Sequence, residues 1–450
     1  MTSIAYRAVF YRLIAFRPAC SIAQFSVSAG SPVRWLSSIS TARKPLRVQP
    51  RSGRQSFAEQ FRRMLCRQFP AWNIETLTSA IDLRRSFSAA FPRAHLARGN
   101  RHVAALACPS PDAEPAILTS ALLWFDYLRA QIGSLDQLSL CLFLPERAGN
   151  LTAHRLHWLS GIPLRTRLFL FNQHGMAGEV DPKDLGNLET RLTSHYTPAQ
   201  LSPELKLLVS RLAGQSNVGC CPEVNGAISI RFRGLEFARI EGGQILLGIE
   251  TKEQVGLSET RRVEEFASNL APLIRALPAF PERWFESSVR SNLEILDPSL
   301  LSEPVHGQIL TFAGGERQLI DLLAISRSGE LAVLELKAAE DMHLPIQALD
   351  YWMRVCWHGE RQELQHLFPG RQVAAVNPKL LLIAPALMFH STNEIILRYF
   401  SPAIEVERIG VNSDWDSALR VAFRLRDAEV PISHRGPDEA RRISQYQEGD

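Results

Sequence analysis

Short apolar runs alternate with longer amphipathic segments over two stretches of the chain. In the first stretch, the runs at 102–108, 138–145 and 165–171 predict buried strands, and the segments at 116–132 and 152–159 predict helices. Strands that alternate with helices in this way indicate a sheet with crossover helices. We therefore expect an α/β unit in the first half of the chain.

The second stretch repeats this order after an additional helix and strand. Its predicted helices cover residues 281–296, 345–357 and 393–400, and its predicted strands cover residues 317–326, 330–338, 379–389 and 403–411. In both stretches the first helix of the repeated order, at 116–132 and at 345–357, contains the dipeptide Asp-Tyr, at Asp126-Tyr127 and at Asp350-Tyr351. The repeated order predicts an internal duplication. The alternative is coincidence, because strand-helix-strand order is common in unrelated domains.

Between these stretches the pattern changes to strict alternation of apolar and polar positions. Residues 227–250 alternate around Gly242-Gly243, which predicts two strands joined by a tight turn. Amphipathic helices are predicted at 202–212 and 258–277, on either side of this segment. We expect a small antiparallel β module that carries its own helices.

These patterns predict an α/β (α+β) protein divided into five segments. The chain has 450 residues, of which 46% are hydrophobic and 21% charged, so it is long enough for two or three compact domains. The predicted segments are a disordered or transit-like segment (1–58), an α/β domain (59–195), the β module with its helix (196–280), a second α/β domain (281–425) and a polar tail (426–450). The chain contains no apolar run of roughly 18 residues, so we expect no membrane partner.

Charge is distributed unevenly along the chain. The formal net charge is +4, but residues 1–58 contain nine Lys or Arg and no acid precedes Glu59. The rest of the chain has 41 basic and 46 acidic residues and is mildly acidic. Contact with nucleic acid must therefore come from a local patch and not from the overall charge.

The Arg-rich, Ser-rich and acid-free composition of residues 1–58 is typical of an organelle transit peptide. Two alternatives are an unstructured tail and translated sequence upstream of the true start. We exclude this segment from the predicted fold. We expect a cytoplasmic protein, or a mitochondrial one if the transit peptide is genuine.

The seven cysteines are scattered, and none forms a C-x-x-C pair. An odd and unpatterned set is typical of reduced thiols in an intracellular protein. The sequence therefore predicts neither a zinc site nor an iron–sulfur cluster.

One predicted strand, residues 330–338, carries charged residues inside an apolar run, at Glu335 and Lys337. The turn before it is centred on 327–329, Arg-Ser-Gly. If Gly329 takes the left-handed position of a three-residue hairpin loop, Asp321 lies directly opposite Glu335.

Two carboxylates in that arrangement repel each other unless a cation lies between them. Magnesium or manganese would supply one, because both ions prefer hard oxygen ligands. Strand alternation puts Lys337 on the same face as Glu335, within reach of a metal-bound water or a scissile phosphate. The alternative is a surface hairpin with an exposed ion pair. The apolar run at 379–389 and the adjoining helices favour a central strand, where unpaired charge is costly.

Asp321 followed by Glu335-Leu336-Lys337 resembles the motif of the PD-(D/E)xK phosphodiesterase superfamily, which has the restriction-endonuclease-like fold. The resemblance covers about residues 281–412 and implies a mixed sheet flanked by helices. It also implies that Asp321 and Glu335 bind the metal, assisted by the backbone carbonyl of Leu336. Lys337 would then activate or orient a water molecule.

Further residues are similar to particular branches of this superfamily. Gln347 and Tyr351 resemble the Q-x-x-x-Y motif of RecB-type nucleases, which positions DNA near the metal, and their spacing puts both on one helix face. Glu286 resembles an acidic residue in the first helix of NucS-type endonucleases. Arg354 is a candidate for binding phosphates. The alternatives are ordinary surface and core roles for Gln347 and Tyr351 and a solvated position for Glu286.

The sequence thus predicts a metal-dependent DNA nuclease, with Mg²⁺ or Mn²⁺ as cofactor, and with single-stranded or branched DNA among the expected substrates. The alternative is a catalytically inactive nucleic-acid-binding or assembly protein that keeps the nuclease fold. A homodimer is expected if both strands are cut. Aligning the two stretches places Leu106, Cys108 and Leu123 at the positions of Glu335, Lys337 and Gln347, so the first domain is interpreted as a degenerate copy.

Overall fold

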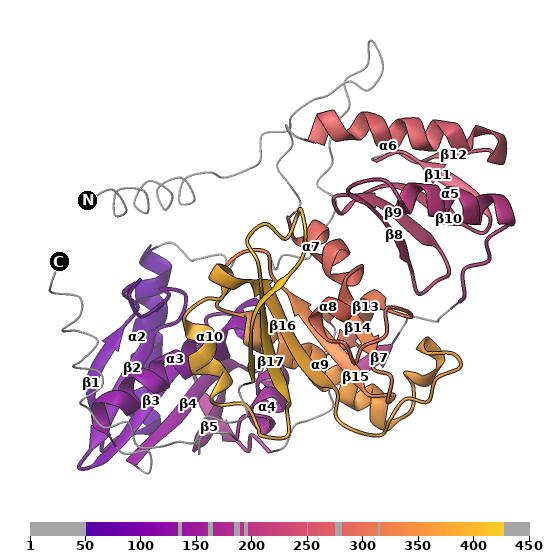
Figure 1. The fold of residues 1–450 in the computed structure, drawn as a ribbon. Helices are drawn as coiled ribbons and strands as arrows, with labels where there is room; N and C mark the ends of the chain where they lie inside the picture. The colour runs from indigo at the N-terminus through magenta and orange to yellow at the C-terminus, as the bar shows by residue number, and fades with distance from the viewer. Residues whose placement is uncertain are drawn as a thin grey trace, which may run out of the picture.

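The computed structural model describes residues 51–133, 137–160, 165–183, 190–192, 197–249, 251–274, 281–313 and 316–426. These residues form three sheets flanked by helices (Figure 1), a mixed architecture that agrees with the expected α+β class. No helix in this described part is long and apolar enough to cross a membrane.

The N-terminal unit is built on a six-stranded sheet in the order β1-β2-β3-β4-β5-β6. Its strands are β1 (Asn73–Thr78), β2 (Arg93–Arg98), β3 (Arg101–Ala107), β4 (Leu138–Pro145), β5 (Thr166–Phe171) and β6 (Ala177–Val180). Its helices are α2 (Arg51–Gln68), α3 (Glu114–Ile132) and α4 (Asn150–His157). Apolar residues of α2 pack on one face of the sheet, whereas those of α3 and α4 pack on the other.

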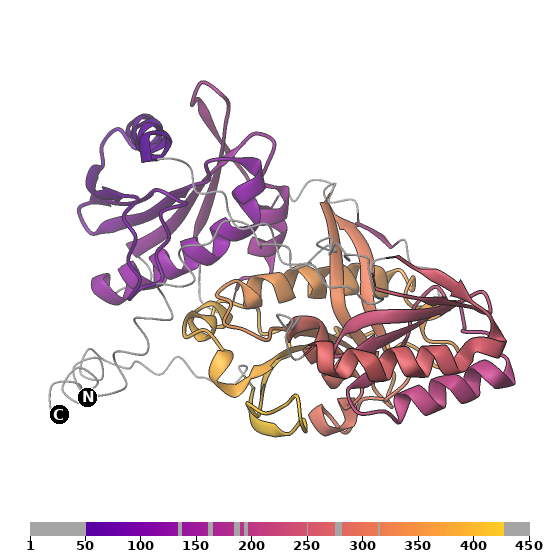
Figure 2. The same ribbon diagram turned by 90° about the horizontal axis from the view of Figure 1, so that it is seen from above.

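The β module is an antiparallel sheet in the order β12-β11-β10-β9-β8. Its strands are β8 (Val218–Pro222), β9 (Ile228–Phe232), β10 (Leu235–Glu241), β11 (Gln244–Leu247) and β12 (Glu253–Val255). Helices α5 (Pro203–Ala213) and α6 (Thr260–Ile274) pack against it and lie side by side (Figure 2). Ala238 pairs with Leu247, which confirms the two-residue turn at Gly242-Gly243.

The C-terminal unit is built on a seven-stranded sheet in the order β18-β17-β16-β15-β14-β13-β7. Its strands are β7 (Thr190–Leu192), β13 (His306–Ala313), β14 (Glu316–Ile325), β15 (Leu331–Leu336), β16 (Lys379–Pro385), β17 (Val406–Val411) and β18 (Val421–Arg426). Its helices are α7 (Pro281–Arg290), α8 (Leu293–Leu296), α9 (Leu344–Glu360) and α10 (Thr392–Leu397). Residues of α7 and α8 pack on one face of this sheet, and those of α9 and α10 on the other.

The two larger sheets have the same topology. In each, a run of three antiparallel strands leads into two parallel pairings, and the last strand is antiparallel (β1 to β6, and β13 to β18). The crossover helices also correspond, because α3 and α9 precede the first parallel partner and α4 and α10 precede the second. The repeated order predicted from the sequence is present and includes additional edge strands. A shared origin of the two units stays a prediction.

The Asp-Tyr dipeptides, however, do not occupy equivalent places. Pro115 and Pro345 both lie in the first turn of their helices, but Asp126 follows the first by eleven residues and Asp350 follows the second by five. Aligned by helix start, Gln347 corresponds to Ile117 and not to Leu123. That part of the predicted alignment is wrong, because it relied on a dipeptide whose depth in the helix differs.

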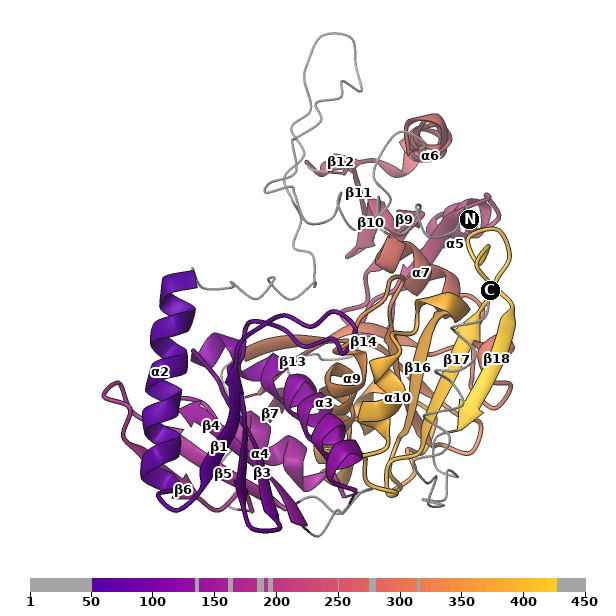
Figure 3. The same ribbon diagram turned by 90° about the vertical axis from the view of Figure 1, so that its left-hand side faces the viewer.

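The two units share one hydrophobic core, which lies between the two sheets and includes α3, α9 and α10 (Figure 3). Arg155 of α4 donates two hydrogen bonds of 2.7 Å to the carboxylate of Asp350 on α9, and both side chains are buried. Tyr399 donates a 3.0 Å bond to Asp126 of α3. The N-terminal unit is therefore packed firmly against the helical face of the C-terminal unit.

Several predicted boundaries differ from the structure. Helix α2 begins at Arg51, inside the segment excluded from the fold, and Phe57 packs on the core. Strand β7 was placed in the N-terminal unit but pairs with β13 of the C-terminal sheet. The helix predicted at 281–296 is broken between α7 and α8, and the strand predicted at 379–389 ends at Pro385. The rest of the transit-like segment and residues 427–450 lie outside the described residues.

Candidate active site

The hairpin formed by β14 and β15 has the register predicted from the sequence. Leu322 pairs with Leu334, and the same register continues to Ile325 and Leu331 next to the turn. Extended by one position, it places Asp321 opposite Glu335. Gly329 has a φ of +90°, and a Cβ atom there would lie 2.3 Å from the carbonyl oxygen of Gln372. The turn therefore requires glycine for its conformation and for space.

Strand β15 is central and not exposed. It lies between β14 and β16, and all six of its residues are buried. The alternative of a surface hairpin is therefore wrong. Solvent cannot screen a charged side chain on a strand in this position. The carboxylate of Glu335 therefore depends on neighbouring groups of the protein.

The two acids of the hairpin lie close together in this buried setting. Glu335 is 1% exposed, and its Oε2 atom has no hydrogen-bond partner. Asp321 is partly buried, and its Oδ2 atom accepts a 3.1 Å bond from the backbone N–H of Leu336. Burial, followed by the charge of Glu335, raises the pKa of Asp321 well above its usual value. Burial also raises the pKa of Glu335. This pair of acids is costly for the folded protein.

Lys337 supplies the nearest positive charge. Its Nζ atom donates a 3.0 Å bond to Oε1 of Glu335, and its side chain is 16% exposed. Burial alone would lower the pKa of Lys337, but the carboxylates of Glu335 and Asp321 outweigh it and the pKa is raised. The amine therefore stays protonated near neutral pH and points along the same face as Glu335.

Glu286 of α7 lies beside this group, although the sequence left a solvated position open. It is 6% exposed, and its charge adds to the raised pKa of Asp321. Arg231 of the β module donates to its Oε1 atom at 3.3 Å. A Cβ atom at Gly307 would lie 3.1 Å from the same oxygen, so this glycine lets the carboxylate lie against β13. The solvated alternative is wrong, and Glu286 connects the β module to the site.

The predicted residues of α9 are placed differently from one another. Gln347 is 8% exposed and its Oε1 atom is buried without a partner, whereas Tyr351 is partly buried against the shared core. Arg354 is 3% exposed and donates to the backbone carbonyl of Asp350 at 3.3 Å. In this conformation its guanidinium lies in the interior, so its predicted contact with a phosphate would require it to move. The roles of all three stay predictions.

Asp341 is an acid near the site that was not predicted from the sequence. Its charge acts on Glu335 and Lys337, and its Oδ1 atom accepts a 2.7 Å bond from the backbone N–H of His343 at the start of α9. An Asp side chain often accepts a hydrogen bond from the backbone N–H two residues further along, and this forms a turn. Such a turn before a helix can be predicted from the sequence. That prediction would have placed Asp341 at the same end of β15 as Lys337.

The donors at this site suit a hard divalent cation. Within the described residues, no three Asp, Glu, His or Cys side chains form a metal-binding group. The residues that could hold such an ion at this site are Asp321 and Glu335, through their carboxylates. Magnesium is commonly held by one or two carboxylates, with water and substrate phosphate as the other ligands. The buried Oε2 atom of Glu335, which has no partner, fits such a role. The structure shows the N–H of Leu336 on Asp321, and the role of its carbonyl stays a prediction.

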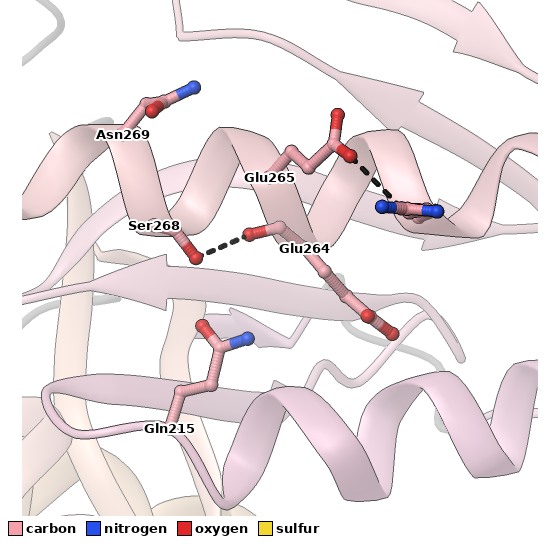
Figure 4. Close-up of a pocket in the computed structure, with 6 residues that line it drawn as sticks. Gln215, Glu264, Glu265, Ser268 and Asn269 are labelled. Carbon is pink, nitrogen blue, oxygen red and sulfur yellow. Dashed lines mark hydrogen bonds and ion pairs between the residues drawn. The ribbon is translucent and has the colours of Figure 1, made fainter.

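A separate hollow of about 520 Å³ lies between α5 and α6 (Figure 4). It is lined by Gln215, Arg261, Glu264, Glu265, Ser268 and Asn269. Its two acids already have partners, because Glu264 pairs with Arg211 at 3.0 Å and Glu265 with Arg261 at 3.1 Å. This open surface of the β module is separate from the hairpin site. Its acids form ion pairs and are not buried opposite each other as Asp321 and Glu335 are.

No protein-family model matches this sequence, and no curated protein is similar to it.

Proposed function

We propose that the C-terminal unit is a metal-dependent DNA nuclease with a restriction-endonuclease-like sheet. The observation that supports this most strongly is that the register of the buried hairpin, extended by one position, puts Asp321 opposite Glu335, with Lys337 at 3.0 Å from one carboxylate. Buried acids with raised pKa values are common at functional sites. They destabilise the fold unless a bound ligand compensates their charge. A divalent cation and a phosphate are the ligands with the matching charges.

The residues divide the work of hydrolysis in a simple way. Asp321 and Glu335 would hold Mg²⁺ or Mn²⁺, which when bound polarises the scissile phosphate and lowers the pKa of water. Lys337 would orient the attacking water and stabilise the negative charge that develops on the phosphate oxygens. Gln347 and Tyr351 would position the strand, and no covalent intermediate is required.

The chain supplies a matched control for testing this proposal. Glu204-Leu205-Lys206 has the same three residue types as Glu335-Leu336-Lys337, but lies in the first turns of α5, where Lys206 is exposed. Labelled single-stranded, duplex and branched DNA are incubated with wild type, Lys337→Ala and Lys206→Ala, in Mg²⁺, Mn²⁺ or chelator. We expect Lys337→Ala to lower the cleavage rate by at least about 100-fold and Lys206→Ala to leave it unchanged.

The outcome distinguishes the proposal from its alternative. Cleavage that persists in chelator and in Lys337→Ala would contradict the proposed site. Tight DNA binding without cleavage in either metal would instead support an inactive nucleic-acid-binding or assembly protein. Circular dichroism of each variant establishes that a loss of cleavage is not a loss of folding.

A further inference from the structure

The hydrogen bonds of the two larger sheets identify which residues of the N-terminal unit stand where the candidate site stands in the C-terminal unit. The backbone N–H of Lys337 donates to the carbonyl of Ile383 at 3.0 Å, and that of Cys108 donates to the carbonyl of Phe143 at 2.8 Å. Both bonds join the end of the first parallel strand to its neighbour. Cys108 is therefore the structural equivalent of Lys337.

The same register identifies the equivalents of the two acids. Glu335 pairs with Leu382 on β16, and Leu106 pairs with Leu142 at the matching place on β4. Across the preceding hairpin, Leu106 pairs with Arg93. Leu106 thus stands in the place of Glu335, as the sequence alignment predicts, and Arg93 stands in the place of Asp321.

At these three positions, the replacements remove the groups that could hold a cation. Arg93 is 5% exposed, donates a 2.6 Å bond to the carbonyl of Ala80 and lies 4.6 Å from the ring centre of Phe87. The side chain of Leu106 has no polar atom, and Cys108 is buried, which raises the pKa of its thiol to about 12. A fixed guanidinium repels a metal ion, and a neutral thiol is a poor ligand for magnesium.

The arrangement of the units also covers one face of the C-terminal unit. Helices α9 and α10 of the C-terminal unit are covered by the N-terminal unit, through the buried pair of Arg155 and Asp350 and the bond from Tyr399 to Asp126. Another copy of the chain cannot bind there without breaking this core. Within the part of the chain that the structure describes, these two similar folds contain one pair of acids placed as Asp321 and Glu335 are.

On this basis, and resting on the proposed function, we propose that the chain cuts only one strand of a duplex at each encounter and releases nicked DNA. Each event adds one water across one P–O bond, so that the water oxygen joins the phosphorus and a proton goes to the leaving oxygen. No second strand is in register with a second centre. The homodimer expected for cutting both strands is then unnecessary.

A supercoiled plasmid in molar excess over the protein tests this inference, in Mg²⁺ and with Asp321→Asn as the inactive control. We expect nicked circles to accumulate as the first product and linear molecules to appear only later, from independent second cuts. We also expect the nicking rate per wild-type molecule to stay within about twofold when a tenfold excess of Asp321→Asn is added, because one chain suffices.

The possible failures differ in what they overturn. Linear DNA that forms without a nicked intermediate, or a rate that falls with added Asp321→Asn while DNA remains in excess, would overturn the one-strand inference alone. Degradation of linear DNA with intact circles would also overturn it and leave the nuclease proposal standing. A protein that cuts none of these DNAs would overturn both.

Discussion

The hairpins β2–β3 and β14–β15 occupy the same place in their sheets, but bury different charges. Arg93 in the first hairpin has a carbonyl partner and an aromatic ring beneath it. In the second hairpin, burial and then the charge of Glu335 raise the pKa of Asp321, and burial raises the pKa of Glu335. The first hairpin also buries a charge at some cost, because the Nε atom of Arg93 has no partner and burial lowers the pKa of its guanidinium. The difference is that the second hairpin buries two acids opposite each other beside one amine, an arrangement more typical of a binding or catalytic site.

The largest effect is expected where the two units meet. Asp350→Ala leaves the guanidinium of Arg155 buried without a counter-charge, so we expect the free energy of unfolding to fall by about 3 to 5 kcal/mol. Glu179→Ala is the matched change within one unit, where Glu179 pairs with Arg167 at 2.6 Å and is 46% exposed. It should cost about 1 kcal/mol. Urea unfolding measures both, and equal losses would mean that the buried pair does not join the units.

The turns of the two hairpins provide the next comparison. Gly99 and Gly329 both have positive φ, but only Gly329 has no room for a Cβ atom. We expect Gly99→Ala to cost about 1 kcal/mol from backbone strain and Gly329→Ala about 3 kcal/mol, because the added methyl also displaces the carbonyl of Gln372. Thermal unfolding measures the difference. If both variants lose the same stability, the close approach at Gly329 is relaxed in solution.

The stabilising role of Arg93 can be separated from any role in catalysis. Arg93→Met removes the bond to Ala80 and the contact with Phe87 while keeping an apolar chain of similar length. We expect a loss of about 1 to 2 kcal/mol in stability and no change in cleavage rate per folded molecule. Denaturant unfolding and the plasmid assay measure the two quantities. A fall in cleavage at a temperature where the variant is folded would show that the N-terminal centre takes part in the reaction.

The smallest effect, and one of opposite sign, is expected at Asp321. Because its pKa is raised from the usual value of 3.8, the folded protein binds an extra proton above that pH, and stability falls as the pH rises through this window. Asp321→Asn should therefore raise the free energy of unfolding by about 1 kcal/mol at pH 7 without metal. The gain should vanish near pH 3, where both states are protonated.

Magnesium provides the control for this prediction. A ligand that binds only the folded state raises its stability, so Mg²⁺ should raise the melting temperature of wild type and leave that of Asp321→Asn unchanged. Calorimetry at several pH values measures both effects. Destabilisation by Asp321→Asn at pH 7 in the absence of metal would mean that the carboxylate is favourable to the fold.

The apolar pattern of the chain predicted most of the buried strands and the crossover helices of both units. The long apolar runs of these elements allow few alternative assignments of strand and helix. Gly329 specifies a turn, and this turn determines the register of Asp321 and Glu335. The inner strands β2 and β13, like the outer strands, were not predicted from the sequence. β1 and β18, for example, are largely exposed, so they show little apolar alternation, and pairing with a neighbour decides their structure.

Contacts between distant segments could not be predicted from the sequence. Arg155 and Asp350 are separated by 195 positions and meet only because two units pack together. Arg231 reaches Glu286 from a different sheet in the same way. The Asp-Tyr repeat shows the opposite error, since a short local match suggested an equivalence that the different positions of the dipeptide along the two helices contradict.

The three residues of β7 have a practical consequence for any attempt to isolate the C-terminal unit. The strand comes from the connection between the N-terminal unit and the β module, yet it caps the edge of the C-terminal sheet by pairing with Thr311, Phe312 and Ala313. A fragment that starts at residue 197 would leave the backbone of β13 open along that edge. Unpaired edge strands recruit other chains, so such a fragment should aggregate, and one that begins before residue 190 would keep its edge protected.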